Sequence, residues 1–224
     1  MLTQFIKDNF KKRYVINLDR RPDRYQEFCE RVPFDYKIVE RLSAVDGQNI
    51  KCEKKHENPF VIGCHLSHKK IIECIINDES LNDNDLFIYF EDDVFFTKEF
   101  ENTFIRSVEY LKNIKNSNYI LNIGGRFEPS YDKRDSKLWK LVTNNLYIKE
   151  SSIQYNSKEI ERTTHCIIMT KSSAKIFYNH INNKEHIPID CLYNSICKNN
   201  NLITRYETFP HICYSPLKYK SDIK

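Results

Sequence analysis

Residues 86–96 join a long apolar run directly to three consecutive carboxylates. Positions 86–90 are all aliphatic or aromatic, Glu91, Asp92 and Asp93 follow at once, and Val94, with two phenylalanines, closes the segment. A short apolar run rich in aromatic side chains and bounded by polar residues is typical of a buried strand. The pattern therefore indicates a central strand whose carboxyl end opens onto an acidic, polar site.

Strands and helices alternate around this segment. Residues 13–18 form a short apolar strand signal, and 19–32 place Pro22 in the first turn of a helix. Residues 34–40 are compatible with a second strand, and 41–50 with a loop that turns at Asp46–Gly47. Further helices are expected at 60–76, 97–114 (with Thr97 as N-cap), 171–181 and 187–200, and further strands at 119–125, 145–151, 165–170 and within 201–216. This order predicts an α/β sandwich with a mainly parallel central sheet.

The size and composition suit one domain spanning residues 1–224. The chain has 224 residues, 40% of them hydrophobic, and its net charge of +4 does not indicate a nucleic-acid groove. No apolar run reaches the length of a membrane span, and charged residues interrupt the N-terminal segment where a signal peptide would be apolar. The eight cysteines form no C-x-x-C pair and read as small buried hydrophobes. We therefore expect a cytoplasmic protein.

The acidic triplet requires a compensating cation, because adjacent carboxylates repel one another. Mg²⁺ and Mn²⁺ prefer oxygen ligands and commonly bridge carboxylates to substrate phosphates. In an extended chain Glu91 and Asp93 point to one side and Asp92 to the other, so one acid can bind a metal ion while another reaches a neighbouring ligand. The alternative is a solvated turn in which the acids cap the helix that follows.

Two more segments carry polar side chains to strand ends or helix starts. Arg20, Arg21 and Arg24 lie at or just inside a helix N-terminus, where guanidinium groups suit phosphate, or alternatively pair with neighbouring aspartates. Ser67 and His68 lie on the helix 60–76. A Ser-His nucleophile pair would also need an orienting acid and an oxyanion hole. The simpler interpretation of His68 is a buried, hydrogen-bonded histidine.

Six segments, in this order, resemble glycosyltransferase family 25, which includes bacterial lipopolysaccharide glycosyltransferases and the collagen galactosyltransferase domains. They cover the chain from about residue 13 to residue 223. The segments are YVINLDRRPDR (14–24), RLSAVDG (41–47), IGCHLSHKKII (62–72), IYFEDDVFF (88–96), PID (188–190) and SDI (221–223).

The resemblance implies a GT-A type nucleotide-binding sandwich that transfers a hexose, galactose or glucose, from a UDP-sugar with inversion. It implies Mn²⁺ or Mg²⁺ on Asp93, with Glu91 and Asp92 on the ribose or sugar hydroxyls of the donor. The nucleoside pocket would be lined by Asn17, Leu18 and Asp46, and the same end would be organised by Arg24, Ser67 and His68.

Inversion also needs a base on the acceptor side. Our candidate is Asp190, at the start of the helix opened by Pro188, with helix capping as the alternative role and Asp222 as second candidate base. A third metal ligand is open between His211, Asp222 and water. Lys218 and Lys220 are candidates for the diphosphate, and the polar segment 126–140 for the acceptor loop.

Two other classes of function compete with this prediction. A catalytically inactive relative could act as a glycan-binding or assembly subunit, but the presence of Asp93 and Asp190 favours an enzyme. A phosphohydrolase or nucleotidyltransferase would need more metal-spaced acids or a phosphate-binding loop, and the sequence has neither. The acceptor stays open between a lipopolysaccharide-like glycan, protein hydroxylysine and a viral or capsular glycan.

Overall fold

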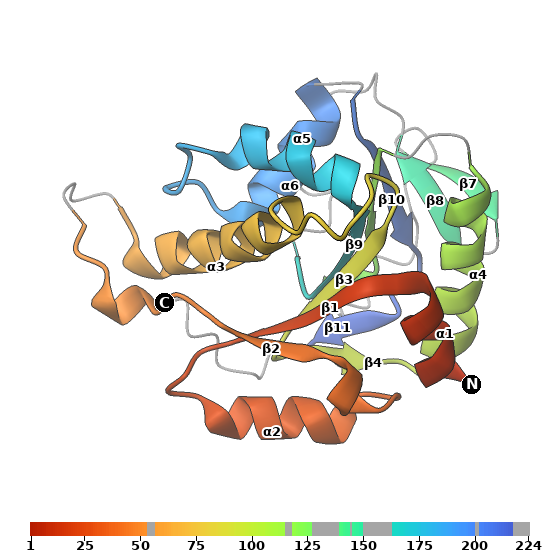
Figure 1. The fold of residues 1–224 in the computed structure, drawn as a ribbon, viewed down its shortest axis with the longest axis horizontal. Helices are drawn as coiled ribbons and strands as arrows, with labels where there is room; N and C mark the ends of the chain where they lie inside the picture. Colours follow the sequence, from red (N-terminus) through yellow and green to blue (C-terminus); the bar gives the residue numbers. More distant parts are fainter. Residues whose placement is uncertain are drawn as a thin grey trace.

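The computed structural model describes residues 1–52, 57–114, 118–126, 139–143, 145–149, 163–199 and 202–216. Its centre is an eight-stranded sheet in the order β2-β1-β3-β9-β5-β10-β8-β7 (Figure 1). The strands are β1 (Phe10–Asn17), β2 (Glu40–Ser43), β3 (Leu86–Glu91), β5 (Tyr119–Asn122), β7 (Trp139–Thr143), β8 (Leu146–Lys149), β9 (Cys166–Thr170) and β10 (Thr204–Thr208). A smaller sheet joins β4 (Phe95–Phe96), β11 (Cys213–Ser215) and β6 (Gly124–Arg126) in the order β4-β11-β6.

The α/β class predicted from the sequence is confirmed, but the central sheet is mixed and not mainly parallel. The N-terminal strands β2, β1 and β3 are parallel, as is the pair β5 and β10. Strand β9 runs antiparallel to both β3 and β5, and β8 is antiparallel to β10 and β7. Segment 165–170 was correctly expected to be a strand, but its direction depends on long-range pairing that periodicity does not reveal.

Helices cover both faces of this sheet. One face packs against α1 (Leu2–Asn9), α2 (Pro22–Arg31) and α4 (Phe100–Asn113), and the other against α3 (Pro59–Ile76), α5 (Lys171–Ile181) and α6 (Ile189–Asn199) (Figure 1). Strand β3 supplies both cores by alternation, since Ile88 and Phe90 point to the first face and Phe87 and Tyr89 to the second. The predicted apolar run is thus a fully covered central strand.

Several local predictions need correction. Residues 36–38 form a 3-10 helix, η1 (Tyr36–Ile38), and the second strand is Glu40–Ser43, most of which was expected to belong to the loop 41–50 and not to the strand 34–40. The acidic residue Asp35 explains the shift, because its side chain accepts from the Lys37 amide and favours a turn. Thr97 is not the N-cap of α4, which begins after Glu99. The expected helices at 60–76, 171–181 and 187–200 are present as α3, α5 and α6.

The length and apolar character of the described helices bear on whether any of them could span a membrane. None of them combines the length and the apolar character that a bilayer-spanning helix requires.

The start of α3 packs unusually close to the turn after β2, at η2 (Gly47–Asn49). A Cβ atom on Gly63 would lie 2.8 Å from the Val45 carbonyl oxygen and 2.9 Å from the Gly47 nitrogen. Both are backbone atoms, so they cannot rotate away. This approach brings α3 against the edge of the sheet where β1 and β3 end.

We expect Gly63→Ala to destabilise the protein by about 1–3 kcal/mol, because overpacking outweighs the gain in helix propensity. Helix propensity alone predicts the opposite sign, a stabilisation of roughly 0.5–1 kcal/mol. Urea unfolding of the variant and the parent measures the difference. A variant as stable as the parent, or more stable, would show that the contact between α3 and η2 is not tight.

Candidate functional site

The acidic triplet lies where three parallel strands end side by side. Ile16 of β1 pairs with Glu91 of β3, and Asn17 pairs with Ser43 at the end of β2. Ligands of open α/β sheets bind beyond the carboxyl ends of parallel strands. The loops that follow β1, β2 and β3 therefore converge on one place, together with the N-terminal half of α3.

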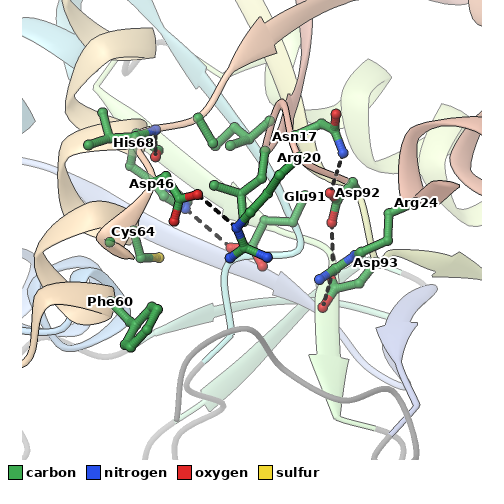
Figure 2. Close-up of a pocket in the computed structure, with 16 residues that line it drawn as sticks. Asn17, Arg20, Arg24, Asp46, Phe60, Cys64, His68, Glu91, Asp92 and Asp93 are labelled. Carbon is green, nitrogen blue, oxygen red and sulfur yellow. Dashed lines mark hydrogen bonds and ion pairs between the residues drawn. The ribbon is translucent and has the colours of Figure 1, made fainter. Parts of the chain in front are cut away.

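A pocket opens at this place, with about 670 Å³ of empty space including the part open to solvent. Nine of the ten residues expected to form the site line it (Figure 2). These are Asn17, Leu18, Arg24, Asp46, Ser67, His68, Glu91, Asp92 and Asp93. An apolar part of the wall comes from Ala44, Val45 and Phe60. The pocket thus combines an apolar wall with a strongly charged floor.

Ser67 and Asp46 shape the side of the pocket next to α3. Ser67 Oγ accepts a hydrogen bond from the Val45 amide at 2.8 Å and donates one to the Gly63 carbonyl at 2.7 Å. Asp46 Oδ1 accepts from the Gln48 amide, and its Oδ2 accepts from Arg20 Nε at 2.7 Å (Figure 2). Ser67 is therefore a structural link to the loop after β2 and does not form a nucleophile pair with His68.

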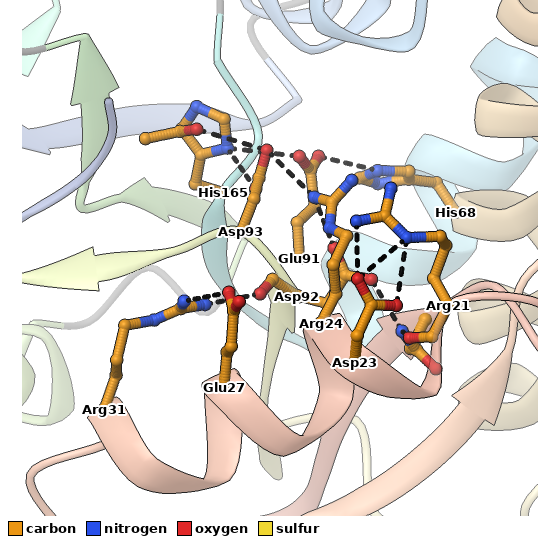
Figure 3. A network of polar contacts seen from close by, with 12 residues as sticks. Arg21, Asp23, Arg24, Glu27, Arg31, His68, Glu91, Asp92, Asp93 and His165 are labelled. Carbon is orange, nitrogen blue, oxygen red and sulfur yellow. Dashed lines mark hydrogen bonds and ion pairs between the residues drawn. The ribbon is translucent and has the colours of Figure 1, made fainter. Parts of the chain in front are cut away.

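Asp92 is not part of the group that Glu91 and Asp93 form with His165, and it shares Arg24 with Asp93. Its carboxylate lies 2.5 Å from Arg24 Nη2 and accepts from Asn17 Nδ2 at 2.7 Å, and its backbone carbonyl accepts from Arg31 Nη2 (Figure 3). Burial raises the pKa of Asp92 to about 6, against the opposing effects of Arg24 and Asn17. Asp92 thus anchors α2 and the end of β1 beneath the pocket.

Glu91 and Asp93 instead face His165, which precedes β9. His165 Nδ1 lies 3.1 Å from Glu91 Oε2 and 3.3 Å from Asp93 Oδ1 (Figure 3). One ligand atom from each of the three residues lies within 4.8 Å of the other two. Two carboxylate oxygens and an imidazole nitrogen fit Mn²⁺, and the two carboxylates also suit Mg²⁺. Within the described chain this is the group whose chemistry fits the expected divalent ion.

The sequence prediction missed His165. Antiparallel pairing of β3 with β9 places Phe90 opposite Cys166, and the Glu91 amide donates to the His165 carbonyl at 3.0 Å. A histidine directly before an apolar strand is the only local signal, and it has no value until the pairing is known. The expected alternative, His211, is not in the group. Its ring lies against Gly125, where an added Cβ would come within 2.0 Å of it.

The charges of this group reinforce one another. Burial alone would lower the pKa of His165, but Asp93 and Glu91 outweigh it and raise the pKa to about 10. Burial would raise the pKa of Glu91, but His165 and His68 reverse the effect and hold that pKa well below its usual range. Both carboxylates are therefore ionised at neutral pH and the imidazole carries a proton in their field.

Asp190 does not line the pocket but lies near it. It is in the first turn of α6, and its Oδ1 accepts from the Cys191 amide at 2.8 Å. Burial raises the pKa of the Cys64 thiol well above its ordinary value, and the charges of Glu91, Asp190 and Asp93 add to this. Asp190 is therefore within electrostatic reach of a residue in the pocket wall. The other predicted positions, Asp222, Lys218, Lys220 and residues 127–138, lie outside the described residues.

The family model of Glycosyltransferase family 25 (LPS biosynthesis protein) matches residues 10–193. No curated protein sequence matches the chain significantly.

Two solved structures illustrate the structural similarity. One is a glycosyltransferase involved in the glycosylation of the major capsid of PBCV-1, with 10% identity and a TM-score of 0.46, matched over 94% of this chain and 93% of that one. The other is a mannose-1-phosphate geranyltransferase from Thermus thermophilus, with 7% identity and a TM-score of 0.43, over 87% and 58%. Similarities at this level say nothing about activity.

The protonated state of His165 leads to a prediction about metal binding. Its Nδ1 must lose its proton to bind a metal ion, and with a pKa of about 10 it holds that proton at neutral pH. We expect Mn²⁺ binding at pH 7.5 to release about one proton per site and the affinity to rise with pH up to about pH 10. Calorimetry in two buffers of different ionisation enthalpy measures the release. A heat independent of the buffer would contradict ligation by His165, and His165→Ala provides the control.

Proposed function

Because this chain belongs to glycosyltransferase family 25, we propose that it transfers a hexose, galactose or glucose, from a UDP-sugar to a hydroxyl group of a glycan or protein acceptor. The proposed reaction depends on a divalent metal ion and inverts the configuration at the anomeric carbon. The observation that best supports it is the group of Glu91, Asp93 and His165, whose two carboxylates line the same pocket as Arg20 and Arg24. A single domain acting in the cytoplasm remains part of the proposal.

The metal group would serve the leaving diphosphate. Asp93, Glu91 and His165 would hold Mn²⁺ or Mg²⁺, which supplies Lewis-acid stabilisation of the charge on departing UDP. Asp93 was expected to be a ligand, and its position 3.3 Å from His165 supports that role. Glu91 was expected to contact the sugar nucleotide, but its carboxylate lies beside the same imidazole. We therefore assign Glu91 to the metal group.

The nucleoside would occupy the end of the pocket near β1 and η2. Asn17, Leu18 and Asp46 line that end with Phe60, whose ring offers an apolar surface to a base. Arg20 holds Asp46 at 2.7 Å and also lines the pocket, so it is a candidate cation for the diphosphate. Arg24 is paired with Asp92 and Asp93, and we assign it, with Asp92, to positioning these strand ends.

Asp190 is our candidate for the base. Its carboxylate would take the proton of the acceptor hydroxyl while that oxygen attacks the anomeric carbon and the bond to UDP breaks with its electrons on the phosphate. Its place in the first turn of α6 and its effect on the pKa of Cys64 support a position close to the pocket wall.

The metal role predicts the behaviour of Asp93→Asn. With Mn²⁺ present, we expect the parent to hydrolyse or transfer from UDP-galactose or UDP-glucose, and the variant to lose activity by roughly two orders of magnitude. The measurement is UDP release across a set of UDP-sugars. Asp83→Asn is the matched control, because Asp83 is an aspartate that pairs with Lys175 at the surface. Full activity in Asp93→Asn, or no UDP-sugar turned over by the parent, would remove the basis of the proposal.

The base role predicts a different result for Asp190→Asn. This variant should bind UDP as the parent does and lose transfer by about 10²- to 10⁴-fold, the contribution typical of a general base. UDP affinity by calorimetry and transfer rate by UDP release separate the two effects. If UDP affinity fell while the circular dichroism spectrum stayed that of the parent, Asp190 would belong to the donor side.

A further inference from the structure

Three buried side chains connect the metal group to helix α6, and the function proposed above gives no role to the two tyrosines among them. Tyr89 lies two residues before Glu91 on β3, so both side chains point to the same face of the sheet. His68 of α3 contacts both of them, and Tyr193 of α6 contacts the Tyr89 hydroxyl. The exposed fractions are 0% for Tyr89, 1% for His68 and 3% for Tyr193.

These residues form one continuous hydrogen-bonded chain, which we call the phenol–imidazole chain (Tyr193, Tyr89 and His68). The Tyr193 hydroxyl bonds to the Tyr89 hydroxyl, which lies 3.1 Å from His68 Nδ1. His68 Nε2 lies 3.2 Å from Glu91 Oε1. An ionised carboxylate can only accept, so His68 Nε2 donates to Glu91. In neutral His68, Nδ1 then accepts from Tyr89, and Tyr89 accepts from Tyr193.

Packing leaves these three side chains little freedom to reorient. The Tyr193 ring stacks on Phe177 of α5 with centroids 4.0 Å apart. The imidazole of His68 meets the Tyr89 ring edge to face at 5.4 Å and the Tyr193 ring at 6.2 Å. The last acceptor of this chain, Glu91 Oε1, also accepts from the Thr164 hydroxyl, and a buried hydrogen-bonded chain restrains how that acceptor is oriented. Here that acceptor is a carboxylate of the candidate metal group.

Helix α6 faces α3 at two successive positions along the helices. On α6, Asp190 and Tyr193 are three residues apart, and on α3, Cys64 and His68 are four apart, so each pair lies on one helix face. Tyr193 meets His68 at one level, and the charge of Asp190 acts on Cys64 at the next. The helix that carries the candidate base is therefore held by the chain that ends on Glu91.

We propose that Tyr193 is a positioning residue: through Tyr89 and His68 its hydroxyl orients the Glu91 carboxylate for the metal ion, and it ties the position of α6 to that of the metal group. The inference rests on the metal group of the proposed function, but not on the identity of the donor or acceptor. Hydrogen-bond partners beyond the direct ligands commonly change metal affinity by about 10- to 100-fold.

The test is Mn²⁺ affinity, measured by electron paramagnetic resonance, in Tyr193→Phe, Tyr89→Phe and the double variant. We expect the Mn²⁺ dissociation constant to rise roughly tenfold in Tyr89→Phe and roughly three- to tenfold in Tyr193→Phe. The double variant should match Tyr89→Phe alone, because Tyr193 acts only through Tyr89. Independent, merely structural effects would instead multiply.

Tyr178→Phe is the matched control, since the Tyr178 hydroxyl donates only to Glu73 on the surface of α3 and α5 at 3.0 Å. It should bind Mn²⁺ like the parent. Thermal unfolding of all variants checks that the fold is kept.

Three results would overturn the inference: a Tyr193→Phe affinity equal to that of Tyr178→Phe, multiplicative effects in the double variant, or a parent protein that does not bind Mn²⁺. A parent that binds Mn²⁺ but uses no UDP-sugar would refute the proposed function, and the comparison of affinities would still decide the role of Tyr193.

Discussion

The structure depends on accommodating three adjacent carboxylates at the end of a buried strand. Strand β3 ends at Glu91, and the turn at Asp92 and Asp93 gives the three acids different sets of partners, although Arg24 Nη2 lies close to both aspartates. Arg24 of α2 and Asn17 of β1 hold Asp92, while His165 lies between Glu91 and Asp93. Removing a partner would leave a buried charge, which is far more costly than losing an exposed ion pair. The elements around the site are thus fixed by the acids that serve it.

The same constraint shapes the pocket above the acids. The close approach of Gly63 to the loop after β2, and the two hydrogen bonds of Ser67, hold α3 beside the strand ends. With α3 in that place, His68 reaches Glu91 from above while Phe60 and Cys64 form the wall. Within α3, Gly63 therefore allows the close approach to the loop, Ser67 attaches the helix to that loop, and His68 contacts Glu91.

Features that depend on local sequence signals were predicted, and features that depend on contacts between distant residues were missed. Strands β1 and β3, helix α3 and the acidic edge were predictable, because hydrophobic periodicity and strand-end polarity are local signals. The nine expected site residues that share one pocket were assigned from the family resemblance. His165 was missed because it meets Glu91 across 74 residues through an antiparallel pairing. The mixed sheet and the start of β2 were missed likewise, since strand direction is set by long-range pairing and the turn at η1 by the Asp35 side chain.

An inverting transfer places demands on both sides of one carbon atom. The leaving group must depart where the metal group lies, and the base must act from the opposite side, so a small relative displacement of the two misaligns the reaction. In the proposed reaction the two sides would come from different elements, since the candidate metal group lies at the end of β3 and the start of β9, and α6 carries Asp190. The buried phenol–imidazole chain is the direct polar link between β3 and α6 among the described contacts. In the proposed reaction, such a link would hold the candidate metal group and Asp190 in fixed relative positions without itself touching the substrate.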